Sequence, residues 1–162
     1  MLSIRALLRI SPLTFVVVLA LAGATTAAAS APIAASGAIT FPTCDFTSQQ
    51  TVGTNTILAG TCYETLTGTF TGTSVAQATV TFHAEGTSEG NAVDTFTGTV
   101  DGRSGTVTFR DLAHGDPSGN VSGTLTIIGG TGGLANLHGS LKQSSTINSN
   151  VSYTGQIQFA GP

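Results

Sequence analysis

Hydrophobic and polar residues alternate with a period of two along most of the chain after residue 30. In residues 95–100, Phe96 and Val100 share one face and threonines occupy the other. The alternation returns near the C-terminus, where Tyr153 and Phe159 oppose serine, threonine and glutamine. A period of two indicates β-strands that have one buried and one solvated face. We therefore predict an all-β fold.

Turn-forming residues separate these alternating segments at short intervals. Asp101-Gly102 lies between two clear strands and predicts a tight hairpin, and glycine-rich breaks follow at 86–90, 115–119 and 129–133. The predicted strands are 38–47, 55–60, 62–72, 75–85, 93–101, 104–111, 120–128, 134–142 and 150–160. Two of them are expected to merge at Gly60, which leaves about eight antiparallel strands.

The strands carry few of the residues that protect an open sheet edge. Exposed edges usually bear lysine, proline or inward-pointing charges, because unpaired backbone groups recruit other chains. Here the outer faces are mainly threonine and serine, and the strands contain one lysine. The economical solution is a closed barrel in which the first and last strands pair. A two-sheet sandwich is the alternative, since alternation alone does not distinguish the two.

The N-terminal segment has the features of an export signal. Arg5 and Arg9 precede an uncharged apolar run over 13–22, and small residues follow over 24–31. We predict a signal peptide over 1–29, a flexible mature N-terminus over 30–37, and a single β-barrel domain over 38–162. The protein is then secreted. A retained anchor is the rival interpretation, but the apolar run is shorter than the roughly 20 residues that span a bilayer.

The charge after residue 29 excludes two classes of partner. Three basic residues, Arg103, Arg110 and Lys142, stand against eight acidic ones. Nucleic-acid binding relies on cationic side chains that displace counterions, so nucleic acid is not expected as a partner. An anionic membrane surface is excluded for the same reason, and no membrane insertion is expected once the signal is removed. The oligomeric state is not predicted.

Two cysteines, Cys44 and Cys62, lie in the mature chain. An even number in an oxidising compartment predicts a disulfide. A redox-active or metal-binding pair is the alternative. The spacing is not C-x-x-C, however, and no histidine is near either cysteine in the sequence.

No group of residues forms a known catalytic, metal or cofactor motif. His83, His114 and His138 lie on different segments without paired spacing, so no metal site is predicted. A nucleophile elbow is missing, and Asp111 and Asp116 are interpreted as solvated residues flanking a loop. We predict no catalytic residues and no cofactor, and whether the protein is an enzyme stays open.

Glu64 stands out because it falls in phase with the apolar residues Leu66 and Phe70. Unbroken alternation directs its carboxyl into the barrel, where a lone carboxylate is costly and its pKa rises. A bulge at Gly60 or Gly68 is the alternative, because it would turn Glu64 to solvent. The candidate residues for a ligand in the lumen are Glu64, Tyr153, Phe70 and Phe96.

Two glycine-rich motifs resemble one family of barrels. Residues 127–139, IIGGTGGLANLHG, are similar to the glycine-rich turn and following strand of the allene oxide cyclase-like barrels, which include the dirigent proteins. Residues 97–105, TGTVDGRSG, match a pattern of an uncharacterised bacterial branch of that group. The chain departs from this branch at His138, where arginine is common, and at Asp111, where histidine is common. The resemblance implies an eight-stranded barrel with an apolar lumen; in characterised relatives that lumen holds a reactive lipid or a phenoxy radical.

Three functions agree with these observations. The first is a non-catalytic secreted barrel that binds a small apolar molecule in its lumen. The second is a cofactor-free cyclase or isomerase that works by confining its substrate. The third is a structural or interaction protein of the cell envelope, with a lumen filled by side chains.

Overall fold

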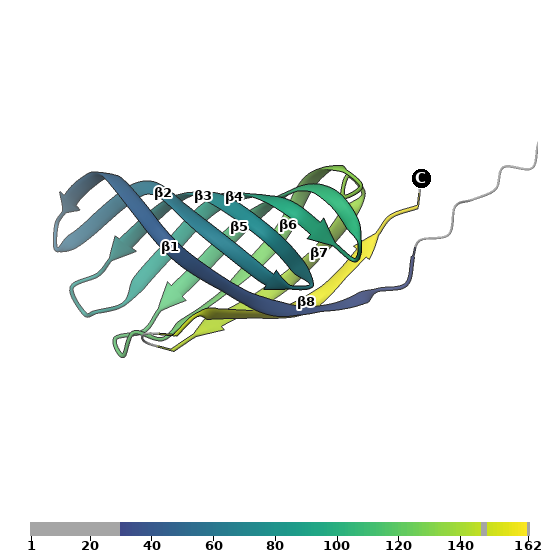
Figure 1. The fold of residues 1–162 in the computed structure, drawn as a ribbon. Helices are drawn as coiled ribbons and strands as arrows, with labels where there is room; N and C mark the ends of the chain where they lie inside the picture. The colour runs from purple at the N-terminus through teal and green to yellow at the C-terminus, as the bar shows by residue number, and fades with distance from the viewer. Residues whose placement is uncertain (1–29, 147–148, 162) are drawn as a thin grey trace, which may run out of the picture.

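The computed structural model describes residues 30–146 and 149–161, and the predicted signal peptide over 1–29 lies outside them. Eight antiparallel strands in this part of the chain form one closed barrel (Figure 1). The strands are β1 Ile33–Val52, β2 Asn55–Gly68, β3 Phe70–Phe82, β4 Ser88–Val100, β5 Arg103–Gly115, β6 Val121–Gly132, β7 Leu137–Ser145 and β8 Val151–Phe159. The predicted fold class is confirmed, as is the merging of two predicted strands at Gly60 into β2.

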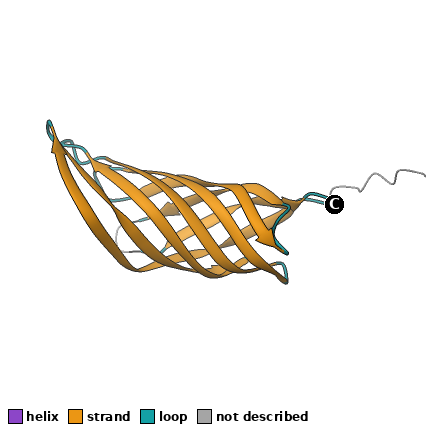
Figure 2. Ribbon diagram, turned by 90° about the horizontal axis from the view of Figure 1, so that it is seen from above, coloured by secondary structure: helices purple, strands orange, loops and turns teal. Residues whose placement is uncertain are grey.

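Closure depends on the first strand, which begins earlier than predicted. Ile33–Ile39 of β1 pair with Val151–Ile157 of β8. Residues 33–37 are therefore not a flexible N-terminus, because their backbone groups complete the ring. Figure 2 shows the strands tilted around the barrel, an arrangement that lets a sheet close on itself.

The chain order gives the barrel two different ends. The short connections at residue 69, at 101–102 and at 133–136 lie at one end, together with both ends of the described chain. We call this the closed end; it is on the right in Figure 1. The connections at 53–54, 83–87 and 116–120 lie at the other end, which we call the open end.

The closed end is filled by large side chains. The Phe70 ring is at the centre, with edge-to-face contacts to Phe96, Phe109 and Tyr153 at centroid distances of 5.5, 5.4 and 5.9 Å. Glycine makes room for these rings: a β-carbon at Gly98 would lie 2.7 Å from the Phe96 ring. This half of the lumen is a packed core.

The turn at Asp101-Gly102 has the backbone that its sequence predicts. Both residues have positive φ, 50° and 73°, as two-residue hairpins of this type require. The turn brings Arg103 to the end of the barrel, where its guanidinium carbon lies 3.8 Å from the centroid of the Phe159 ring. The arginine therefore covers the closed end.

The disulfide is present between two neighbouring strands. Cys44 of β1 is the register partner of Cys62 of β2, with 4.0 Å between their Cα atoms. No helix in the described part of the chain meets the length and hydropathy of a membrane-spanning helix.

Candidate functional site

The open half of the lumen holds a cavity of about 140 Å³. Small side chains line most of it, so the interior that is filled at the closed end stays hollow here. The walls come from Cys62 of β2, Ala76, Ala78 and Val80 of β3, Ala92 of β4 and Ala113 of β5. Phe41 of β1 also lines the cavity and is 46% exposed, which places it at the entrance.

Glu64 lies at the inner end of this cavity. Strands β2 and β3 pair without a break from Thr56 to Leu66, and the two irregularities of β1 lie on the other side of β2. The phase of β2 is therefore kept, and Glu64 points into the lumen with only 6% of its surface exposed. The bulge that would have turned it to solvent does not occur in this strand.

Burial changes the acidity of Glu64. Loss of hydration, reinforced by the negative charge of Asp111, raises the pKa of Glu64 to about 7. The hydroxyl of Ser74, directly opposite on β3, partly offsets this rise. That hydroxyl is buried and has no partner at hydrogen-bonding geometry, so its effect on Glu64 is weak.

Asp94 is a second buried acid close to Glu64. It projects inward between Ala92 and Phe96, is 2% exposed, and is the register partner of Ala76 in the cavity wall. Burial, followed by repulsion from Glu64 and Asp111, raises the pKa of Asp94 to about 8. Its Oδ1 atom has no hydrogen-bond partner among the described residues.

Asp111 completes the group from β5. It lines the cavity, and burial raises its pKa to about 6, while a hydrogen bond from the side-chain amide of Gln143 on β7 limits the rise. The prediction that Asp111 is a solvated loop residue is wrong, because β5 continues to Gly115 and its alternation turns Asp111 inward. Asp116 does lie in the following turn. We call Glu64, Asp94 and Asp111 the carboxyl cluster.

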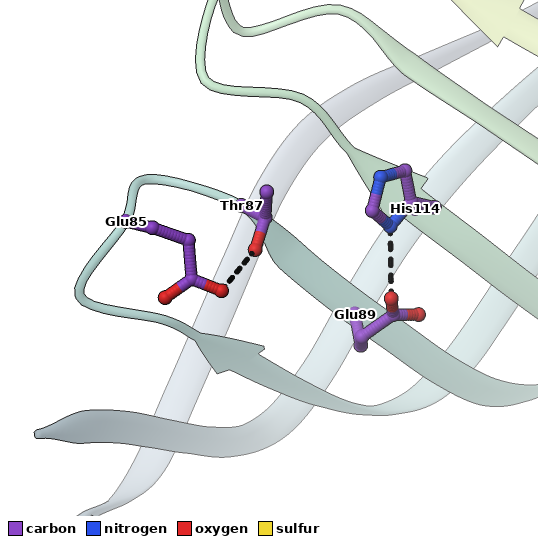
Figure 3. Close-up of polar contacts among 4 residues, drawn as sticks. All are labelled: Glu85, Thr87, Glu89 and His114. Carbon is purple, nitrogen blue, oxygen red and sulfur yellow. Dashed lines mark hydrogen bonds and ion pairs between the residues drawn. The ribbon is translucent and has the colours of Figure 1, made fainter.

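Glu85 and Glu89, which lie outside the cluster on the outer surface, have ordinary partners. Figure 3 shows Glu89 of β4 beside His114 of β5, and Glu85 beside Thr87. The Glu89 carboxylate is 2.8 Å from His114 Nδ1, and Glu85 accepts a hydrogen bond from the Thr87 hydroxyl at 3.1 Å. The broad hollow beside Glu89 and His114 is lined largely by serine, threonine and glycine on the outside of the barrel. Within residues 30–146 and 149–161, no lysine, arginine or histidine nitrogen lies within 4.0 Å of a cluster carboxylate.

The other sequence-predicted lumen residues lie away from the cavity. Phe70, Phe96 and Tyr153 are all buried in the packed closed end. The Tyr153 hydroxyl donates to the Thr67 carbonyl at 2.9 Å and accepts from the Phe70 N–H at 3.0 Å, so it is not bonded to Glu64. Of the four candidates, only Glu64 reaches the cavity.

Sequence reasoning missed Asp94, although its signal was present. Asp94 lies within the predicted strand 93–101 and has the same parity as Phe96 and Val100, so applying the alternation to the whole strand would have placed it inside. Asp111 and Gln143 were missed because the predicted strands ended at 111 and 142. Among the described residues, no group of three or more histidine, cysteine or acidic side chains is arranged to hold a metal ion.

Comparison with known proteins supports the barrel. A model of a family described as "Protein of unknown function (DUF3224)" matches residues 37–156. A crystal structure of a DUF3224 protein of unknown function from Shewanella oneidensis MR-1 superposes with a TM-score of 0.65 at 18% identity. The match covers 82% of this chain and 98% of that one, and at this identity it shows the fold. No curated protein gives a significant match. Because the family model covers most of the barrel, the chain belongs to the DUF3224 family.

Proposed function

We propose that the open half of the barrel binds one small molecule whose body is mostly apolar. The observation that carries this proposal is the cavity of about 140 Å³ with alanine walls and buried carboxyls at its inner end. Ligand sites are typically concave and apolar, with a few polar groups that fix orientation. An apolar cavity of similar size, about 150 Å³, is known to hold benzene in another protein.

The contrast between the two halves of the lumen supports ligand binding in the open half. Aromatic and aliphatic side chains fill the closed end, whereas small side chains make up most of the cavity walls at the open end. A barrel with a purely structural role gains stability when its interior is filled, because each void loses packing contacts. The hollow and the uncompensated acids both cost stability, which is typical of functional sites.

Toluene and benzyl alcohol are suitable probes of the cavity. We expect both to shift the NMR signals of the Ala76, Ala92 and Ala113 methyl groups in a saturable manner. Ala92→Leu fills the cavity and should remove the shifts, whereas Ala34→Leu, on the exposed side of β1, should leave them unchanged. If neither these probes nor their amine analogue benzylamine gives saturable shifts in the unmodified protein, the cavity is not a binding site. Ala78→Leu provides a second filled variant should Ala92→Leu fold poorly.

A second candidate function is a cofactor-free cyclase or isomerase, which the resemblance to allene oxide cyclase-like barrels favours. The specific observation is that the Glu64 carboxyl lines the cavity with a pKa of about 7, so it can exchange a proton near neutral pH. The test is incorporation of deuterium at a carbon atom of a bound compound in D₂O, because O–H and N–H protons exchange without catalysis. Incorporation that Glu64→Gln abolishes supports catalysis, and recovery of an unlabelled, unchanged compound supports binding alone.

We also propose that the protein works outside the cytoplasm. The disulfide between Cys44 and Cys62 fits an oxidising compartment. Sequencing the N-terminus of the protein recovered from culture medium tests this. The proposal expects cleavage near residue 29, and a chain retained in the cytoplasm with residue 1 present would contradict it.

A further inference from the structure

We propose that the ligand carries a protonated amine, which enters the open end head first and is held by the carboxyl cluster. This inference rests on the proposed function, because it names the chemical class of the molecule that the cavity takes. It is carried by the closeness of three buried acids, by unpartnered buried polar atoms and by the lack of any inward-facing positive charge among the described residues.

The strand register of the barrel brings together three acids, which lie on β2, β4 and β5. Ala76 pairs with Asp94 across β3 and β4, and Ala92 pairs with Asp111 across β4 and β5. Glu64 lies on β2, directly opposite Ser74. Each acid is close enough to at least one other for their charges to interact. The cluster therefore forms one electrostatic site.

Two polar atoms beside the cavity are buried and unsatisfied. The Ser74 hydroxyl and Asp94 Oδ1 have no hydrogen-bond partner in the described part of the chain, and both residues are more than nine-tenths buried. A buried polar atom without a partner costs about 1–3 kcal/mol. Asp94 projects into the lumen beside Ala76 and Ala92 of the cavity wall without itself lining the cavity, and a ligand group that extends past these alanines would satisfy it.

The charges around the cluster determine which kind of ligand head group can bind there. The polar side chains at the cluster are its own acids, Glu64 from β2, Asp94 from β4 and Asp111 from β5, together with Ser74 from β3 and Gln143 from β7. None of these is basic, and Arg103, Arg110 and Lys142 are all exposed on the outside. An anion would be repelled, and the acids are not arranged to chelate a metal ion. An ammonium group supplies a positive charge and three N–H donors, which match the available acceptors.

Proton release accompanies binding in this scheme. Near neutral pH the free cluster holds protons, because burial and mutual repulsion raise the pKa values of Glu64 and Asp94 to about 7 and 8. An ammonium favours the ionised carboxylates, so its binding expels protons to solvent. Affinity should therefore increase from pH 6 to pH 8 and decrease above the pKa of the amine itself.

Isothermal titration of the secreted protein at pH 8 with benzylamine, benzyl alcohol, toluene and benzoate tests the inference. The four probes share one ring and differ in the head group. We expect benzylamine to bind at least about tenfold more tightly than benzyl alcohol, with the heat depending on the ionisation enthalpy of the buffer. Benzoate should not bind.

Variants of the cluster test whether it is responsible for the preference for an amine. Asp94→Asn and Glu64→Gln should each reduce the preference for benzylamine over benzyl alcohol about tenfold, whereas Glu89→Gln, on the outer face, should not change it. Equal binding of benzylamine, benzyl alcohol and toluene would overturn the amine inference and leave the proposed function standing. Failure of all four probes to bind would overturn both. The pH dependence in the unmodified protein is an independent check that needs no variant.

Discussion

The side-chain amide of Gln143 on β7 donates a hydrogen bond to Asp111 on β5, across the intervening strand β6. It passes over Gly123, which pairs with Ala113 on one side and with Gln143 on the other. A β-carbon at Gly123 would lie 2.8 Å from the Gln143 amide nitrogen. Glycine at this point therefore lets a side chain from one wall fix an acid on another.

Replacing Gln143 should raise the pKa of Asp111. The amide stabilises the charged carboxylate, so Gln143→Ala removes that stabilisation and moves the pKa of Asp111 above its value of about 6. Carbon-13 NMR titration of the aspartate carboxyls measures the shift. Gln77→Ala, on the outer face, is the matched control. An Asp111 titration that is unchanged or moved to lower pH in Gln143→Ala would contradict the contact.

The protein should be more stable at pH 5 than at pH 9. Acids in an unfolded chain release their protons near pH 4–4.5, whereas the folded cluster holds its protons until pH 6–8. The folded state therefore binds more protons in this window, and the free energy of unfolding decreases as pH rises. The rise in the pKa of Glu64, caused by burial and by Asp111, corresponds to about 3 kcal/mol. Urea denaturation at both pH values measures the difference.

The Asp94→Asn variant distinguishes the contribution of the carboxyl cluster to the pH dependence of stability from the contributions of other groups. Removing its charge should reduce the loss of stability between pH 5 and pH 9, whereas Glu89→Gln on the surface should leave that loss unchanged. A protein that is equally stable at both pH values, or more stable at pH 9, would show that these acids are hydrated in the folded state.

Tyr153→Phe should destabilise the barrel without changing ligand binding. The variant leaves the Thr67 carbonyl and the Phe70 N–H without their partner in a packed region, at a cost of about 1–3 kcal/mol. The affinity for benzylamine should stay the same, because Tyr153 is outside the cavity lining. If the fully folded variant bound benzylamine more weakly, Tyr153 would instead belong to the binding site.

Reducing the disulfide should lower the free energy of unfolding by about 3 kcal/mol, since the bond links residues 18 apart and restricts the unfolded chain. The Cys44→Ser/Cys62→Ser double variant should reproduce this loss in reducing buffer. A double variant as stable as the oxidised protein would show that the hairpin of β1 and β2 is already fixed by its other contacts.

The fold could be predicted from the sequence, but only part of the site could. Alternation, turn residues and unprotected edges predicted a closed barrel of about eight strands, and the phase of β2 placed Glu64 inside. The depth at which each inward residue lies was beyond sequence reasoning. It depends on strand tilt and register, which put Phe70 and Tyr153 in the packed end and Glu64 at the cavity. Asp111 was misplaced because its strand was ended too early.

Glu64 is a buried carboxyl that faces a cavity, and we propose that this cavity takes an amine. The most direct measurement is the carbon-13 NMR titration of the Glu64 carboxyl, with and without benzylamine. We predict a midpoint near pH 7 in the free protein, reflecting its burial and the nearby Asp111, and a lower midpoint when benzylamine is bound. A midpoint near 4.5 that benzylamine does not change would contradict the account.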